Sequence, residues 1–85
     1  MKKKDKALAV KISTPREVLW EGEAESISSE NAEGKFDILP QHIDFITLIQ
    51  GKPIIVRTEE GDKQFSFKDA VIHVSRGDTR IFGDV

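Results

Sequence analysis

The sequence predicts an all-β fold in which two layers of sheet bury their apolar faces against each other. Three observations support this prediction. Most large apolar residues are branched at Cβ, with ten Ile and six Val against four Leu and one Met, and such side chains suit a pleated sheet better than a helix. Turn-forming residues interrupt the chain about every 8–12 residues, as in a sandwich or barrel. Between them, apolar residues recur at every second position, which is the strand period.

The chain is predicted to be one domain with a basic start. Its 85 residues are too few for two separate cores. Residues 1–6 carry a net charge of +3 and are interpreted as a solvated tail, and the total of −2 then leaves −5 on residues 7–85. This acidic body argues against nucleic acid as the main partner. Cysteine is absent, which excludes disulfides and thiolate metal sites. No apolar run approaches the roughly 20 residues that span a bilayer.

The first predicted strand covers residues 8–13, and the segment after it has two interpretations. Thr14-Pro15-Arg16-Glu17 is a good helix start, with a hydroxyl at the cap, proline at the first position and glutamate three residues after the cap. Residues 18–32 could follow as a helix on pattern alone. Gly22 and a serine-rich stretch argue against that helix, and the two interpretations are nearly balanced. Two short strands joined at Gly22 fit the rest of the chain better.

The later segments show the strand pattern more clearly. Residues 34–48 read as a strand, a turn at Pro40 and a second apolar strand, and the proline ring makes that corner stiff. Ile54-Ile55-Val56 is continuous, as in a strand that is covered on both sides. Alternating faces follow in Phe65 and Phe67, and in Ala70, Ile72 and Val74, which lie opposite Val71, His73 and Ser75.

Acidic residues are numerous but do not form a recognisable active site. Glu21, Glu23 and Glu25 alternate in a predicted strand, so they share one face. A solvated face is the usual meaning of such a row, and a site for a hard cation is the alternative. No glycine-rich phosphate loop or nucleophile motif appears. We therefore predict no catalytic, cofactor-binding or metal-binding residues.

The two histidines have different surroundings. His73 shares the outer face of its strand with Val71 and Ser75 and is expected to be a packing or surface residue. His42 follows Pro40 in a turn, where its ring could cap the turn, pair with Asp44 or contact a partner. A triad of Ser13, His42 and Asp44 can be written down, but no motif supports catalysis.

Residues 34–48 resemble the epsilon subunit of F-type ATP synthases. The family pattern at this place is matched by Gly34, Phe36, Ile38, Leu39, Pro40, His42 and Thr47. The start of the chain is also similar to the family's opening strand, Thr-Pro turn and Glu-Gly corner, with Thr14, Pro15, Glu21 and Gly22. The segment from Phe65 to Phe82 looks like the family's closing hairpins. The likeness spans residues 8–84.

This resemblance implies a β-sandwich of two sheets with about ten short strands over residues 7–85, which decides the segment after Thr14 in favour of strands. It also implies a non-catalytic rotor subunit that couples ion transport to ATP synthesis. Such a subunit is peripheral, on the cytoplasmic side of the membrane, and links the gamma subunit to the c-ring of the central stalk. By position, Thr14, His42 and Thr47 would face gamma, and the loop Glu33-Gly34-Lys35 would approach the c-ring.

The sequence also departs from the family pattern. Asp37 and Gln41 stand where the family has glycine, Ile43-Asp44 replaces Ala-Pro, and Asp69-Ala70 replaces Gly-Gly. Because glycine permits conformations that other residues rarely adopt, the corner is expected to be re-formed. No helical pattern follows Val85, so we expect no C-terminal helical hairpin, no inhibitory tail and no ATP binding. The alternative function is a free-standing β-sandwich that binds a protein or peptide at an edge strand.

Overall fold

The computed structural model describes residues 7–40 and 44–85, and these residues form strands and turns without a helix. Nine strands lie within them, close to the ten that were expected. Their bounds are β1 (Leu8–Ser13), β2 (Val18–Ala24), β3 (Ser26–Asn31), β4 (Gly34–Ile38), β5 (Phe45–Gln50), β6 (Pro53–Thr58), β7 (Gly61–Ser66), β8 (Asp69–Ser75) and β9 (Asp78–Gly83). The all-β prediction is therefore confirmed.

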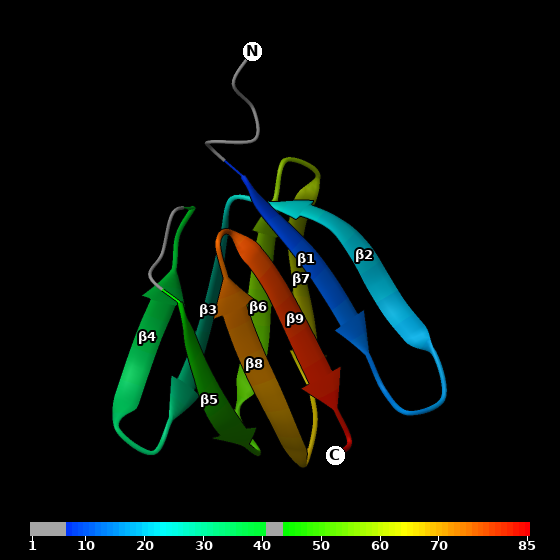
Figure 1. Cartoon of the computed structure of the whole chain (residues 1–85), viewed down its shortest axis with the longest axis vertical. Coiled ribbons are helices and arrows are strands. Elements are labelled where there is room, and N and C mark those ends of the chain that lie inside the picture. The colour runs from blue at the N-terminus through cyan, green and yellow to red at the C-terminus, as the bar shows by residue number, and fades with distance from the viewer. Residues whose placement is uncertain (1–6, 41–43) are drawn as a thin grey trace.

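The strands form two sheets that pack face to face, as Figure 1 shows. The five-stranded sheet has the order β2-β1-β9-β8-β5, and the four-stranded sheet has the order β4-β3-β6-β7. The first and last strands, β1 and β9, are neighbours and run parallel. The other pairs are antiparallel. The pairing of the first strand with the last strand therefore joins the two halves of the larger sheet.

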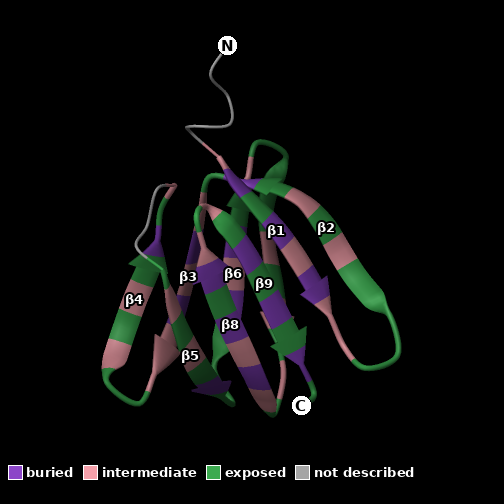
Figure 2. Ribbon diagram, viewed as in Figure 1, coloured by how far each residue is buried: buried purple, intermediate pink, exposed green. Residues whose placement is uncertain are grey.

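The core lies between the sheets and is formed by the alternating positions. Buried and exposed residues alternate along the strands in Figure 2. The predicted inner face of β8 is confirmed, and β1 shows the same alternation, because the inward apolar residues of both strands are at most 2% exposed. The buried apolar residues are Leu8, Val10, Ile12, Ala24, Ile27, Ile38, Ile49, Ile54, Val56, Ala70, Ile72, Val74 and Ile81.

The segment after β1 is a tight turn followed by a strand, not a helix. The backbone N–H of Thr14 donates to the carbonyl of Glu17 at 2.8 Å. The Thr14 hydroxyl accepts from the N–H of Arg16 at 3.2 Å, so it caps a turn of the chain rather than a helix. The helical interpretation of residues 18–32 is wrong, because these residues pair in two different sheets.

The expected junction at Gly22 is also corrected. Strand β2 continues through Gly22 to Ala24, and the break before β3 falls at Glu25. Gly22 has a packing role instead, since a Cβ added there would lie 2.8 Å from a carbon of the Trp20 ring. The Trp20 ring lies over this glycine, in the space that a side chain at position 22 would occupy.

Strand β6 is covered on one side only, which corrects the expectation of burial on both sides. Ile54 and Val56 are fully buried, but Ile55 between them is half-buried on the outer face of the four-stranded sheet. It pairs with the polar residues Ser28 and Gln64. A run of three apolar residues in the sequence therefore does not show whether a strand is covered on one face or on both.

Candidate interface for partner proteins

The structure brings together Thr47 and the turn that was expected to approach the c-ring. Thr47 lies on β5 and faces inward, since it pairs with the buried Ile72. Its hydroxyl accepts a hydrogen bond of 2.9 Å from the Asn31 side chain, which comes from the last residue of β3. Asn31 directly precedes the two-residue turn between β3 and β4. The predicted gamma-facing strand and the predicted c-ring turn thus meet at one edge of the sandwich.

The turn itself presents charges to the surroundings. Glu33 and Lys35 are exposed, and Gly34 between them has a φ of +126°, a conformation that L side chains rarely adopt. The backbone N–H of Glu33 donates to the Asn31 side-chain oxygen at 2.8 Å. One carboxylate therefore projects from the turn and one ammonium group from the start of β4, next to a turn whose backbone is held by a side chain.

Thr14 is not part of this cluster. It lies in the turn between β1 and β2, whereas Thr47 lies on β5 at the opposite edge of the five-stranded sheet. Both turns, the one with Thr14 and the one with Glu33, are at the lower end of the molecule in Figure 1. His42, the third predicted gamma contact, lies outside the described residues.

Sequence reasoning missed an apolar row on the outer face of the five-stranded sheet. By strand register, the row crosses Leu48 on β5, Val71 on β8, Phe82 on β9 and Ser13 on β1, and it ends at Val18 on β2. Leu48, Phe82 and Val18 are 47%, 39% and 50% exposed. Ile46, which is 66% exposed, lies beside the row on the same face of β5. Contiguous exposed apolar surface of this kind marks interaction sites.

A signal for this row was present in the sequence. Strand β5 carries large apolar side chains in both phases of the alternation, with Phe45 and Ile49 inward and Ile46 and Leu48 outward. A strand with one solvated face carries polar residues in one phase. Apolar residues in both phases therefore indicate a second covered face, and no described element of the chain covers it.

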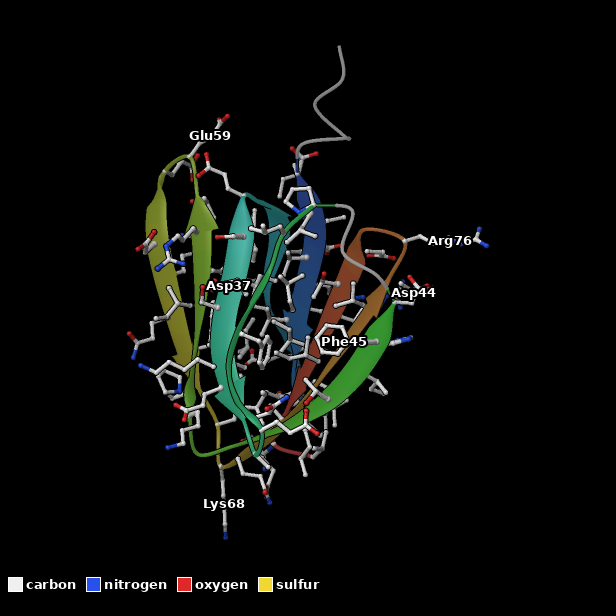
Figure 3. The ribbon with its side chains drawn as sticks, turned by 90° about the vertical axis from the view of Figure 1, so that its left-hand side faces the viewer. Asp37, Asp44, Phe45, Glu59, Lys68 and Arg76 are labelled. Atoms are coloured by element: carbon white, nitrogen blue, oxygen red, sulfur yellow. The ribbon has the colours of Figure 1, made fainter. Side chains whose placement is uncertain are left out.

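The candidate catalytic triad is not assembled. Ser13 lies at the lower end of β1, whereas Asp44 precedes β5 at the opposite end of the sheet. The Asp44 carboxylate accepts a hydrogen bond of 2.8 Å from the backbone N–H of Arg76, in the turn between β8 and β9. Asp44 and Arg76 lie close together in Figure 3. Asp44 thus orders a hairpin turn, and the separation from Ser13 excludes a joint catalytic role.

The acidic row and His73 lie on open surface. Glu21, Glu23 and Glu25 are exposed, and among the described residues no group of three His, Cys, Asp or Glu side chains could hold a metal ion. His73 is exposed on β8, between Ile46 on β5 and Arg80 on β9. It therefore lies on the same face as the apolar row, as its outward phase predicted.

Comparison with known protein families identifies the fold. The delta/epsilon chain β-sandwich domain of ATP synthase matches residues 7–85. The chain belongs to this ATP synthase family. The resemblance seen in the sequence is confirmed.

Relatives from bacteria support the assignment. The chain is 34% identical over 80 residues to an ATP synthase epsilon chain of Clostridium novyi, which covers 93% of this chain and 61% of that protein. It is 30% identical over 77 residues to an ATP synthase epsilon chain of Brevibacillus brevis, with 91% and 54% covered. The chain therefore spans little more than half the length of these relatives.

Solved structures show the same fold. A chain of the Euglena gracilis mitochondrial ATP synthase, in a structure of its OSCP, F1 and c-ring, superposes with a TM-score of 0.83 at 17% identity and covers 92% of this chain and 51% of its own length. A chain of the Tetrahymena thermophila central stalk and c-ring gives 0.75 at 13% identity, with 89% and 62% covered. In the part of the chain that the structure describes, no helix is long and apolar enough to cross a membrane.

Proposed function

We propose that this domain is a rotor subunit of an F-type ATP synthase that joins the gamma subunit to the c-ring. In this role it transmits rotation between ion transport and ATP synthesis, as a peripheral component on the cytoplasmic side of the membrane. Family membership supports the proposal that the chain is part of an ATP synthase, since the bacterial relatives are ATP synthase epsilon chains. The domain binds protein partners and carries out no reaction of its own.

The apolar row is the observation that carries the gamma contact. Its apolar members lie on four strands of the larger sheet, with the polar Ser13 of β1 between Phe82 and Val18, so it offers a broad surface rather than a single side chain. Burying apolar area contributes about 25 cal/mol per Å², which makes such a row a suitable centre for a protein interface. Gamma docks on this face; Thr14 and Thr47 remain further predicted contacts, and the predicted contact His42 lies outside the described residues.

A rotor part must also resist deformation, and both long edges of the sandwich are closed by aromatic contacts. At one edge the rings of Phe36 on β4 and Phe45 on β5 meet edge to face, with centroids 5.9 Å apart and an angle of 88°. At the other edge the Lys63 ammonium of β7 lies 5.9 Å from the centroid of the Trp20 ring on β2. Each contact joins one sheet to the other. A closely packed body held at both edges transmits force with little internal movement.

Binding to the cognate gamma subunit tests the proposal. We expect the chain to bind gamma at micromolar concentration or below. Phe82→Ser is expected to weaken that binding about tenfold or more, because it removes a large exposed side chain from the middle of the row. Ile55→Ser is the matched control, since Ile55 is half-buried on the outer face of the other sheet. Isothermal titration calorimetry provides the affinities.

Three outcomes would contradict the proposal. The wild-type chain could fail to bind gamma at micromolar concentration while binding an unrelated protein, which would favour a free-standing binding module. Phe82→Ser and Ile55→Ser could weaken gamma binding equally, which would remove the apolar row as the docking face. ATP could bind to the 85 residues, and we expect titration with ATP to show no heat of binding.

A further inference from the structure

Two turns of the molecule have nearly the same construction. Residues 31–34 and 58–61 are both two-residue hairpins that end in a glycine with positive φ, +126° at Gly34 and +122° at Gly61. In each, the side chain of the first residue accepts from the backbone N–H of the third. The distances are 2.8 Å from Glu33 to Asn31 and 3.1 Å from Glu60 to Thr58. The second turn is therefore an internal control for the first.

The two turns differ in the group to which the side chain of their first residue donates a hydrogen bond. The Thr58 hydroxyl donates to the carbonyl of Gly61 at 2.7 Å, so its hydrogen bonds stay within the turn. The Asn31 amide instead donates to the hydroxyl of Thr47 at 2.9 Å, on a strand of the other sheet. An asparagine side chain offers an acceptor and a donor on one planar group. Asn31 uses both, one toward its own turn and one across the sandwich.

The surroundings favour a persistent link. The bond between Asn31 and Thr47 is partly buried, and a hydrogen bond that is shielded from water holds its partners more firmly than an exposed one. The Phe36–Phe45 ring pair joins the neighbouring strand β4 to the same strand β5, so the sheets are also held together by rings at this edge. The orientation of the turn is therefore defined by two contacts of different chemistry.

We propose that Asn31 is a positioning residue that fixes the turn of Glu33 and Lys35 relative to β5. The consequence for partners rests on the proposed rotor function, in which this turn meets the c-ring. Without the link to Thr47, the Asn31 side chain can rotate and release the N–H of Glu33. The turn then samples several directions, and its charges must be ordered again when the c-ring binds, which lowers affinity.

The first experiment measures order in the turn itself. Backbone ¹⁵N relaxation of the 85-residue chain gives order parameters for residues 32–35. We expect wild-type values near those of the strands, about 0.85, and lower values in Thr47→Val, which removes the hydroxyl but keeps the shape of the side chain. Thr47→Ser retains the hydroxyl and should restore the wild-type order. Thr58→Ala should loosen residues 59–60 and leave residues 32–35 unchanged.

The second experiment measures binding of the gamma-bound chain to purified c-ring. Asn31→Ala removes both side-chain hydrogen bonds of Asn31, so it is expected to weaken c-ring binding about fivefold or more and to change gamma binding less. Unchanged order in Thr47→Val would overturn the inference whatever the partners do. Increased motion with unchanged c-ring affinity would overturn the role in positioning and leave the rotor function standing. Failure of the wild-type chain to bind the c-ring would overturn the proposed rotor function. The order parameters would still show whether the Asn31–Thr47 hydrogen bond holds the turn.

Discussion

At the residue scale, the core contains one polar group that its neighbours do not satisfy. Thr79 on β9 is fully buried, and among the described side chains its hydroxyl is the buried polar group without a hydrogen-bond partner. It pairs with Val10 and Val74, so its surroundings are apolar. A buried hydroxyl without a partner loses its bonds to water and gains none in return.

Thr79→Val is therefore expected to stabilise the domain by about 1 kcal/mol, because the valine keeps the shape and removes the unsatisfied group. Urea unfolding followed by circular dichroism gives the free energy of unfolding. Thr58→Val is the control and should destabilise, since the Thr58 hydroxyl holds the turn between β6 and β7. A loss of stability in Thr79→Val would show that its hydroxyl has a partner in solution.

At the element scale, a chain of polar side chains crosses the outer face of the four-stranded sheet. The Ser28 hydroxyl donates to the Asp37 carboxylate, and the Arg57 guanidinium donates to the Ser28 oxygen at 2.8 Å. Arg57 also lies 3.9 Å from the Asp62 carboxylate. The chain thus joins β4, β3, β6 and β7 in order. Asp37 has ordinary strand geometry and no positive φ, so the expected re-formed corner is not needed at this position.

Asp37→Gly is expected to destabilise the domain by about 1–2 kcal/mol, because it removes the Ser28 hydrogen bond and places a glycine in a strand. Asp37→Asn keeps an acceptor for the Ser28 hydroxyl and should lose less than half as much. Thermal unfolding of both variants measures the effect. Equal losses would show that the polar chain contributes through the charge of Asp37 and not through the hydrogen bond.

At the scale of the whole molecule, the contacts between the sheets determine how rigidly it can transmit force. The rings of Phe36 and Phe45 contact each other at one edge of the sandwich and join the two sheets there. The Phe45 ring points into the space between the sheets in Figure 3. The two sheets are also connected by the Lys63–Trp20 contact at the other edge, by the Asn31–Thr47 hydrogen bond, and by the core side chains and crossing loops. An edge that opens would let the sheets slide past each other.

Phe36→Leu is expected to lower the free energy of unfolding by about 1 kcal/mol, because it keeps most of the apolar volume but removes the edge-to-face ring contact. It should also raise the hydrogen exchange of β4 and β5 amides more than that of β1 and β9. Exchange followed by mass spectrometry tests this. A uniform increase over all strands would mean that the ring pair supports global stability without holding that edge.

Some features could be predicted from the sequence only in part. The alternation in β1 and β8 identified their inner faces correctly, because the strand period is local. The role of Gly83 could not be predicted, since a Cβ there would lie 2.4 Å from the Phe67 ring, which comes from the loop after β7. The hydrogen bond between Asn31 and Thr47 could not be predicted from the sequence either. The family resemblance names Thr47 and the turn as separate contacts and does not indicate that they meet.

The sequence by itself determined the all-β sandwich, and the epsilon family entered only through the resemblance of its motifs. Strand period, Cβ branching and turn residues act between near neighbours in the chain, so they can be read without a structure. Only the tertiary structure decided that β1 pairs with β9, that Asn31 reaches across to Thr47, and that Leu48, Val71 and Phe82 align into an apolar row. These features arise where segments far apart in the chain meet, and their register depends on the packing of the whole fold.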